Sequence, residues 1–269
     1  MNLHYETVSP LLKETLQKLV NSPIFKDFTL IGGTCLSLQL GHRRSIDIDL
    51  FTDIDYGTMN TKEMKEFIQR SFPYSENTDS LDTSALGYTL YMGDSPIDKI
   101  KVDFFYTEKF IFPIQEIDHI RIADIREIAA MKLSAITEEE PRQKDFWDIH
   151  ELNEKYSFKD MIDWGIKRNE WSVTEEGILN GFQKIDSVKE SPEGIDCFKG
   201  NYWSLVKDDL KEILKIFNFK ELSDKVGDKF SCKNKNEYPR RVITLLRSNP
   251  DGIKQRIIDA VKPYLPVIK

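Results

Sequence analysis

The sequence predicts an α/β (α+β) protein, with a small mixed sheet flanked by helices in residues 1–155 and a helical domain in residues 156–269. Before about residue 122, short apolar runs separated by glycine, proline and polar turns are typical of strands. After that point the apolar residues recur about every 3.6 positions, which is the period of an amphipathic helix. We therefore place the domain boundary near residue 155.

The composition is that of a folded, soluble protein. The 269 residues are 40% hydrophobic, 31% charged and 11% aromatic, and they can bury a sizeable core. No stretch of about 18 apolar residues runs without a charge, and the first residues lack the pattern of a secretion signal. Cys35, Cys197 and Cys232 are odd in number and far apart, which indicates reduced thiols. We expect a cytoplasmic protein with no membrane contact.

The two ends of the chain differ in charge. The net charge is −7, yet residues 201–269 hold 15 Lys and Arg against 9 Asp and Glu. An acidic first part suits the binding of cations, and a basic last part suits a polyanion. Because the lysines alternate with Asp and Glu, a solvated helical surface is the simpler explanation of the basic end.

The first half of the chain gives clear signals for its elements. Ser9-Pro10 opens an amphipathic helix that ends before Asn21-Ser22-Pro23. Thr58 or Asn60 is a plausible cap for the next long helix. The further elements predicted here are a strand at 28–31, helix 35–40, strand 46–51, helix 61–71, hairpin strands 88–92 and 100–106, and edge strands 111–113 and 120–122.

The second half is predicted to be helical. One helix spans 123–136 and another spans 142–154, separated by an acidic segment that ends in Pro141. From residue 158 onward we expect helices throughout, including 204–217 and 238–247, with a Lys-rich, mobile stretch between residues 224 and 236.

Two aspartates inside an apolar run are the strongest chemical signal. Asp47 and Asp49 are separated by one residue, so in a strand both carboxylates emerge on one face. Their mutual repulsion must be offset by a cation or a shifted proton. Asp103 is a third carboxylate in a separate apolar strand, where it could complete a site for Mg²⁺ or Mn²⁺ and accept a proton from a nucleophile. The alternative for each is an exposed strand position.

A glycine turn precedes these aspartates by about thirteen residues. Gly32 and Gly33 break the first strand, and Thr34 follows where an N-cap or first-turn hydroxyl would begin a helix. Glycine lets a ligand approach the backbone closely, and the start of a helix attracts anions, so this turn can cradle phosphate oxygens. A strand-ending turn without a ligand is the alternative.

Together these residues resemble a known active-site signature. Gly32-Gly33-Thr34, Asp47-Ile48-Asp49 and Asp103 look like the signature of the nucleotidyltransferase superfamily related to DNA polymerase beta. More narrowly, the stretch from Leu30 to Phe51 resembles the AbiEii/AbiGii toxin family of abortive-infection and toxin–antitoxin systems. Threonine stands at position 34 where the wider superfamily often has serine, which keeps the hydroxyl.

A second signature agrees with this family. Residues 124–136 resemble its helix with an inward lysine, Lys132, and residues 142–149 resemble its Arg-x-Lys-Asp-x-x-Asp helix, which contains Asp145. The resemblance covers about residues 28–152. It implies that Asp47, Asp49 and Asp103 bind the metals and that Gly32, Gly33 and Thr34 hold the triphosphate. It also implies that Lys132 contacts nucleotide phosphate and that Asp145 is a second polar anchor.

Several charged residues near these motifs have plainer explanations. Lys132 and Asp145 could be a structural ion pair without any ligand. Arg142 and Asp148 are as readily explained as charges on a helix surface. His42 and His150 are better explained as structural histidines than as general bases. Arg43-Arg44 could meet phosphate or RNA, but exposed loop charges explain the pair equally well.

The resemblance implies a metal-dependent nucleotidyltransferase. It would transfer a nucleoside monophosphate from an NTP to an acceptor hydroxyl, such as one on tRNA or another RNA, as the toxin of a pair with a cognate antitoxin. We expect its active site in the cleft between the two domains. One alternative keeps this chemistry with a protein or a small molecule as the acceptor. Another is a catalytically idle module that binds a nucleotide or a partner.

Overall fold

The computed structural model of the protein describes residues 2–77, 86–191, 195–198, 200 and 202–229. The chain divides into two compact units, residues 1–214 and residues 215–269, and the fold described below belongs to the first. The sheet and the helices that follow it, up to α7, lie in that one unit. A domain boundary near residue 155 stays a prediction.

The described residues form one seven-stranded mixed sheet, with the strand order β3-β4-β5-β2-β1-β7-β6. Strand β2 runs parallel to β5, and β1 runs parallel to β7, while the other neighbours are antiparallel. The strands are β1 Thr29–Ile31, β2 Asp47–Thr52, β3 Tyr74–Asn77, β4 Gly87–Ser95, β5 Asp98–Tyr106, β6 Gln115–Ile117 and β7 Ile120–Ile122.

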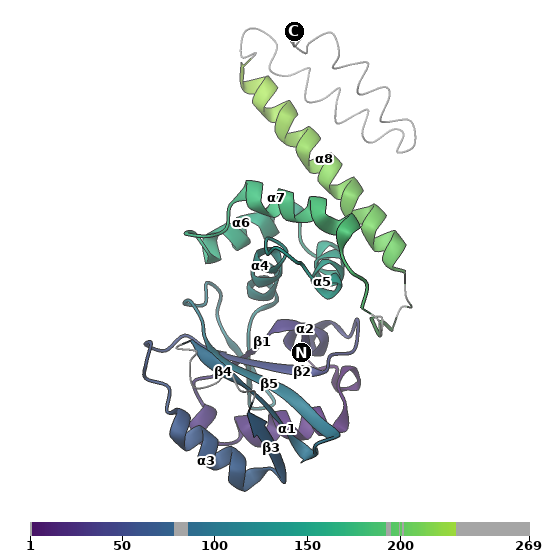
Figure 1. The fold of residues 1–269 in the computed structure, drawn as a ribbon. Helices are drawn as coiled ribbons and strands as arrows, with labels where there is room; N and C mark the ends of the chain where they lie inside the picture. The colour runs from purple at the N-terminus through teal and green to yellow at the C-terminus, as the bar shows by residue number, and fades with distance from the viewer. Residues whose placement is uncertain (1, 78–85, 192–194, 199, 201, 230–269) are drawn as a thin grey trace. The chain divides into compact units, whose positions relative to one another are not determined.

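Helices cover both faces of this sheet. Figure 1 shows α1 and α3 on one side, and α2 with α4 to α7 on the other. The α-helices are α1 Pro10–Val20, α2 Gly32–Leu40, α3 Thr61–Ser71, α4 Ile125–Ala135, α5 Gln143–Asn153, α6 Phe158–Arg168, α7 Glu175–Gln183 and α8 Trp203–Lys229. Short 3₁₀ helices are η1 Tyr5–Thr7, η2 Pro23–Phe25 and η3 Lys184–Ser187. The mixed α/β architecture confirms the predicted fold class.

The pattern of β2 separates an apolar face from a carboxylate face. Ile48, Leu50 and Thr52 are fully buried, whereas Asp47 and Asp49 alternate with them and are partly buried. Because successive side chains of a strand point to opposite faces, the two aspartates lie on one side of the sheet. Lysines of α4 and α5 act on these aspartates, so the carboxylate face is the one that α2, α4 and α5 cover.

Helix caps explain where the sequence prediction was most accurate. The Ser9 hydroxyl accepts the backbone N–H of Leu12 at 3.1 Å, and α1 begins at the next residue, Pro10. The Asn60 side chain accepts the N–H of Glu63 at 3.2 Å at the start of α3. A cap satisfies an N–H that would otherwise have no partner in the helix, which fixes the first residue.

Other predicted elements need correction. Helix α2 begins at Gly32 rather than at Cys35. Residues 111–113 form no strand, because the N–H groups of Ile111 and Phe112 donate to the Glu127 carboxylate instead. The edge strands β3 and β6 were not predicted.

The region after residue 158 is not helical throughout. Residues 188–191 and 195–198 form no helix, and Cys197 makes an isolated antiparallel bridge with Arg43. Residues 224–229 of the expected mobile stretch are part of α8. The rest of that stretch and the helix predicted at 238–247 lie outside the described residues. Among the described helices, none is long and apolar enough to cross a membrane.

Candidate active site

The register of β2 and β5 brings the three predicted carboxylates to one face. Asp49 lies directly opposite Asp103, and Asp47 lies opposite Lys101. Burial, followed by the charges of Asp103 and Asp47, raises the pKa of Asp49 from 3.8 to about 6. Burial is the larger cause, and the repulsion from the other two carboxylates, which a bound cation would relieve, adds to it.

Two of these three carboxylates form ion pairs with lysines. The Lys101 ammonium donates to Asp103 Oδ2, while the Thr89 hydroxyl donates to Asp103 Oδ1 at 2.6 Å. Lys144 Nζ lies 3.7 Å from Asp47 Oδ2. Asp103 is therefore oriented by two neighbours, and Asp47 has a looser contact with a lysine of α5.

The glycine turn lies very close to one of these carboxylates. Gly32 has a φ of +69°, and a Cβ added there would lie 2.0 Å from Asp49 Oδ2. A Cβ on Gly33 would lie 2.7 Å from Arg43 Nη2. Both the backbone conformation and the lack of space thus require glycine at position 32. The turn directly adjoins the carboxylate face.

The Thr34 hydroxyl ties α2 to the start of β2. Its Oγ1 lies 2.8 Å from Ser45 Oγ and hydrogen-bonds the Asp47 carbonyl oxygen. Thr34 is only 1% exposed. The hydroxyl therefore fixes the strand that carries Asp47 and Asp49 relative to the glycine turn.

Behind the carboxylates lies a buried cluster of charges. Lys132 Nζ is 2.7 Å from Asp145 Oδ1 and 2.7 Å from Asp148 Oδ2. Arg43 binds Asp148 through Nε and Nη2, both at 2.7 Å. Burial opposes the charge of Asp148, but Arg43 and Lys132 hold the pKa of this carboxyl well below its usual range. Asp148 is fully buried, so the interpretation as a surface charge is wrong.

Other residues of this region join the same cluster. Arg142 donates to Asp145 Oδ2 through Nε at 2.8 Å, although its own side chain is largely exposed. His42 Nε2 lies 2.9 Å from Asp148 Oδ1. His150 Nε2 lies 2.9 Å from Asp209 Oδ2 instead. These contacts agree with structural roles for the two histidines.

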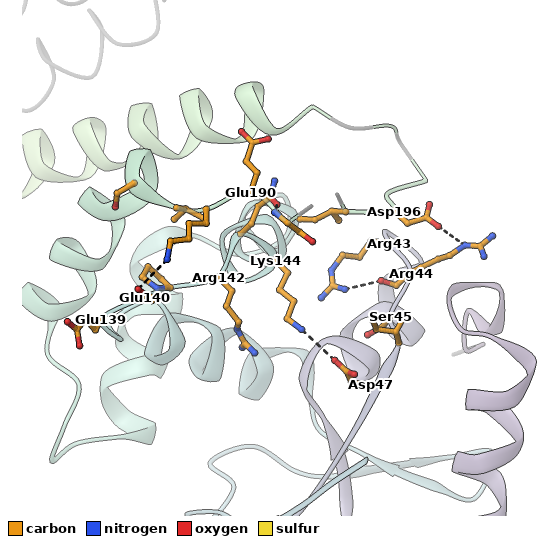
Figure 2. Close-up of a pocket in the computed structure, with 18 residues that line it drawn as sticks. Arg43, Arg44, Ser45, Asp47, Glu139, Glu140, Arg142, Lys144, Glu190 and Asp196 are labelled. Atoms are coloured by element: carbon orange, nitrogen blue, oxygen red, sulfur yellow. Dashed lines mark hydrogen bonds and ion pairs between the residues drawn. The ribbon is translucent and has the colours of Figure 1, made fainter. Parts of the chain in front are cut away.

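A cavity of about 930 Å³ opens beside Asp47 (Figure 2). Figure 2 shows Lys144 reaching toward Asp47 across this space. Of the eight predicted site residues, all of which are described, Asp47 alone lines the cavity. The cavity wall consists of residues 43–47, 139–144, 187–191, 195 and 196. It thus includes residues from both sides of the boundary predicted near residue 155.

Lys144 is a site residue that the sequence analysis did not single out. It lines the cavity beside Asp47, and burial and the neighbouring charge of Arg142 lower its pKa. The available signal was its place in the Arg-x-Lys-Asp motif, two residues after Arg142. Lys132 is buried between two carboxylates, whereas Lys144 faces the open space.

The donor set fits a hard divalent cation. Carboxylate oxygens are the ligands that Mg²⁺ and Mn²⁺ prefer. Within the described residues, no group of three or more His, Cys, Asp or Glu side chains is arranged to hold a metal as it stands. Instead, Lys101 forms an ion pair with Asp103, and Lys144 forms one with Asp47. For all three carboxylates to bind a cation, these two lysines would have to move away from Asp103 and Asp47.

Solved structures share this fold. A structure of a candidate nucleotidyltransferase from Helicobacter pylori has the same fold, with a TM-score of 0.51 at 13% identity, covering 81% of this chain and 94% of that one. MenT4, a nucleotidyltransferase toxin of Mycobacterium tuberculosis, is a weaker match, with a TM-score of 0.46 at 12% identity over 76% and 82% of the two chains.

Sequence comparison specifies the family. Residues 14–177 match the family described as nucleotidyl transferase AbiEii toxin, type IV TA system. The chain belongs to this family and is a nucleotidyltransferase. An uncharacterised protein of Aquifex aeolicus strain VF5 is 33% identical over 222 residues, which covers 76% of this chain and 95% of that protein.

Proposed function

We propose that this enzyme transfers a nucleoside monophosphate from an NTP to a hydroxyl of an RNA acceptor such as tRNA, with Mg²⁺ or Mn²⁺ held by Asp47, Asp49 and Asp103. The observation that carries the proposal is the register of β2 and β5, which places Asp49 opposite Asp103 with Asp47 on the same face. Family membership supports the chemistry, and the basic end of the chain supports a polyanionic acceptor.

The chain's own groups account for the handling of the NTP. Gly32 and Gly33 begin α2 next to Asp49 and Arg43, and the first N–H groups of a helix have no partner within it, so a triphosphate could accept hydrogen bonds from them. In this proposal Lys132 contacts a phosphate of the nucleotide, and Asp145 is a second polar anchor in the pocket. Lys144 and Arg142 add positive charge at the cavity wall beside Asp47.

In this proposal Asp103 takes the proton from the attacking hydroxyl. Thr89 and Lys101 hold its two oxygens in a fixed orientation, opposite Asp49. A positioned carboxylate can act as a general base once its lysine partner has moved. A divalent cation, when bound, would neutralise the triphosphate and lower the pKa of the hydroxyl.

Labelling separates the parts of this proposal. The enzyme is incubated with each NTP, labelled in turn at the α-phosphate, together with Mg²⁺ and total RNA. Label should enter RNA and pyrophosphate should appear with the wild type. A variant with Asp47→Ala and Asp49→Ala should lose both signals. Asp98→Asn, an exposed carboxylate at the start of β5, is the control that should keep them.

The outcomes distinguish the candidate acceptors. Equal labelling by the wild type and the double variant would refute the catalytic roles of Asp47 and Asp49. Pyrophosphate release with label in protein, or in a small molecule, would keep the enzyme and replace the RNA acceptor. NTP binding that needs no Mg²⁺ and gives no pyrophosphate would favour the binding module over catalysis.

We also propose that the chain acts as the toxin of a pair with a cognate antitoxin, since its family is one of toxins. Expression should arrest growth, and Asp49→Ala should abolish the arrest. Continued growth with the active wild-type enzyme would remove the toxin role and leave the chemistry intact.

A further inference from the structure

The segment between α2 and β2 exposes two side chains on the same side. Arg43 and Ser45 are buried, whereas Arg44 and Ile46 are exposed, which is the alternation of an extended chain. Arg44 and Ile46 both line the cavity beside Asp47. Ile46 is 67% exposed. A single exposed isoleucine is ordinary, so the argument depends on its neighbours.

An aromatic ring lies next to Arg44, one member of this pair. The guanidinium carbon of Arg44 is 5.9 Å from the ring centroid of Phe198, and Phe198 is 47% exposed. Arg44 Nε lies 3.1 Å from Asp196 Oδ2, which holds the guanidinium near the ring. We call Arg44, Ile46 and Phe198 the stacking platform. It offers a ring and a guanidinium plane beside an apolar side chain.

The backbone of the platform is well anchored. The Phe198 N–H donates to the His42 carbonyl at 3.2 Å, and the Arg44 N–H donates to the Asp196 carbonyl at 2.8 Å. Between them, Arg43 forms the bridge with Cys197, and the Arg43 side chain binds the buried Asp148. A surface held in this way loses little conformational entropy when a ligand binds.

We propose that the stacking platform binds unpaired bases at the single-stranded end of the RNA acceptor, an inference that rests on the proposed function. Unstacked bases bind to aromatic rings and guanidinium planes. Arg44 and Ile46 of the platform line the same cavity as Asp47, so a base stacked on the platform would bring its own strand end toward Asp47. Of the five carboxylates at the cavity wall, Glu140 is paired with Lys189, Asp196 with Arg44 and Asp47 with Lys144. The other two are Glu139 and Glu190.

The openness of the platform favours a strand over the base of the NTP. Pockets for small molecules usually enclose most of their ligand. Arg44 is 58% exposed at its side chain and Phe198 is about half exposed, so a base resting on them would remain partly in solvent. Single-stranded nucleic acids commonly bind in this open manner, with the backbone near basic side chains.

Binding measurements test the platform without requiring turnover. The probes are a fluorescent single-stranded RNA oligonucleotide, an abasic ribose-phosphate strand of the same length, each NTP, and inorganic tripolyphosphate. Phe198→Ala should weaken binding of the RNA by about 5- to 100-fold, the range for loss of one stacked base. Binding of the abasic strand and of tripolyphosphate should change less than twofold. Phe198→Trp should restore RNA binding.

Two further variants serve as controls. Phe198→Leu keeps an apolar side chain but removes the ring, so it should behave like Phe198→Ala if stacking is the interaction. Trp171→Ala removes a fully exposed aromatic side chain on the α6–α7 connection, and it should leave RNA binding unchanged. Thermal melting of each variant shows whether a weaker signal reflects unfolding.

Each other outcome overturns the inference in a distinct way. Equal RNA binding by the wild type and Phe198→Ala would refute the role of the stacking platform, but it would not contradict the proposal that RNA is the acceptor. Loss of NTP binding, with RNA and tripolyphosphate unaffected, would assign the platform to the base of the NTP. If the wild type binds no RNA, the platform and the RNA acceptor both fall, while nucleotidyl transfer is still judged by pyrophosphate release.

Discussion

The two ends of helix α4 carry buried ion pairs with different surroundings. Near its start, Glu127 accepts Arg168 Nε at 2.6 Å and two backbone N–H groups of the 107–113 loop. Near its end, Lys132 lies between Asp145 and Asp148. All of these side chains except Arg168 are at most 5% exposed, and Arg168 is 8% exposed.

The difference between the ends is their balance of charge. The Glu127 end has one carboxylate and one guanidinium, and its remaining partners are neutral groups, including the Thr107 hydroxyl. The Lys132 end brings three cations, Lys132, Arg43 and Arg142, to two carboxylates. Burial, followed by the charges of these three cations, lowers the pKa of the neighbouring Lys144.

A closed, neutral pair is what stability alone requires, since an uncompensated buried charge is costly. The excess of positive charge at the Lys132 end faces the three carboxylates of β2 and β5, where it partly offsets the pKa shift of Asp49. We infer that the first network serves the fold and the second serves an anionic substrate. The following predictions test this contrast.

The largest effect is expected where one carboxylate serves several cations. Asp148→Ala leaves Arg43 and Lys132 buried with too few partners, so the free energy of unfolding should fall by about 3–5 kcal/mol. Urea unfolding measures this loss. Asp163→Ala, which removes an exposed i,i+4 partner of Lys159, should cost less than about 0.5 kcal/mol. Similar losses from both variants would contradict the burial argument.

Removing one cation from each end separates stability from activity. Arg168→Met should destabilise the protein by about 3–5 kcal/mol, because it leaves the buried Glu127 carboxylate without a cation. Lys132→Met should cost less, because Asp145 keeps Arg142 and Asp148 keeps Arg43. At a temperature where both variants remain folded, Lys132→Met should lose about 100-fold in transfer rate, as when a group that stabilises transition-state charge is removed. Arg168→Met should keep the wild-type rate per folded molecule. An equal loss of rate in both would refute the division of roles.

The contrast also shows what the sequence could reveal. Asp47, Asp49 and the glycine turn are neighbours along the chain, so strand periodicity and turn chemistry were enough to place them on one face. Asp148 was different, because its main partner, Arg43, is 105 residues away. The sequence holds no local sign of that contact. The contact of Lys144 with Asp47 is likewise distant in sequence, although its place in the Arg-x-Lys-Asp motif was a signal for Lys144 itself.

The same reasoning applies to the fold. Helices α1 and α3 were predicted to the residue at their starts because Ser9 and Asn60 are local caps. The strand predicted at 111–113 is a loop because Glu127, on a later helix, takes the loop's N–H groups. Side chains that satisfy a distant backbone leave no periodic pattern in the sequence.

A smaller effect is expected on the dependence of stability on pH. The folded pKa of Asp148 is lower than its unfolded pKa, so its charge stabilises the fold above the usual carboxyl range. That contribution falls as the pH drops below about 4 and vanishes once it passes the folded pKa. The stability difference between the wild type and Asp148→Asn should therefore be constant above about pH 5 and shrink below about pH 4. Urea midpoints across this range measure it. A difference that grows on acidification would reverse the assigned sign.

The smallest effect concerns a thiol beside the start of α4. Cys35 donates to the carbonyl of Ala123 at 3.7 Å, and burial raises its pKa to about 12. Thiolate is the reactive form, so iodoacetamide at pH 8.5 should leave Cys35 unmodified in the native protein, as judged by peptide mass spectrometry. Arg168→Met loosens the Glu127 end of α4 and should permit slow labelling. Lys132→Met acts at the other end of α4. Compared at the same global stability, it should give less labelling of Cys35 than Arg168→Met. Equal labelling in the two variants would show that the two ends of the helix open together.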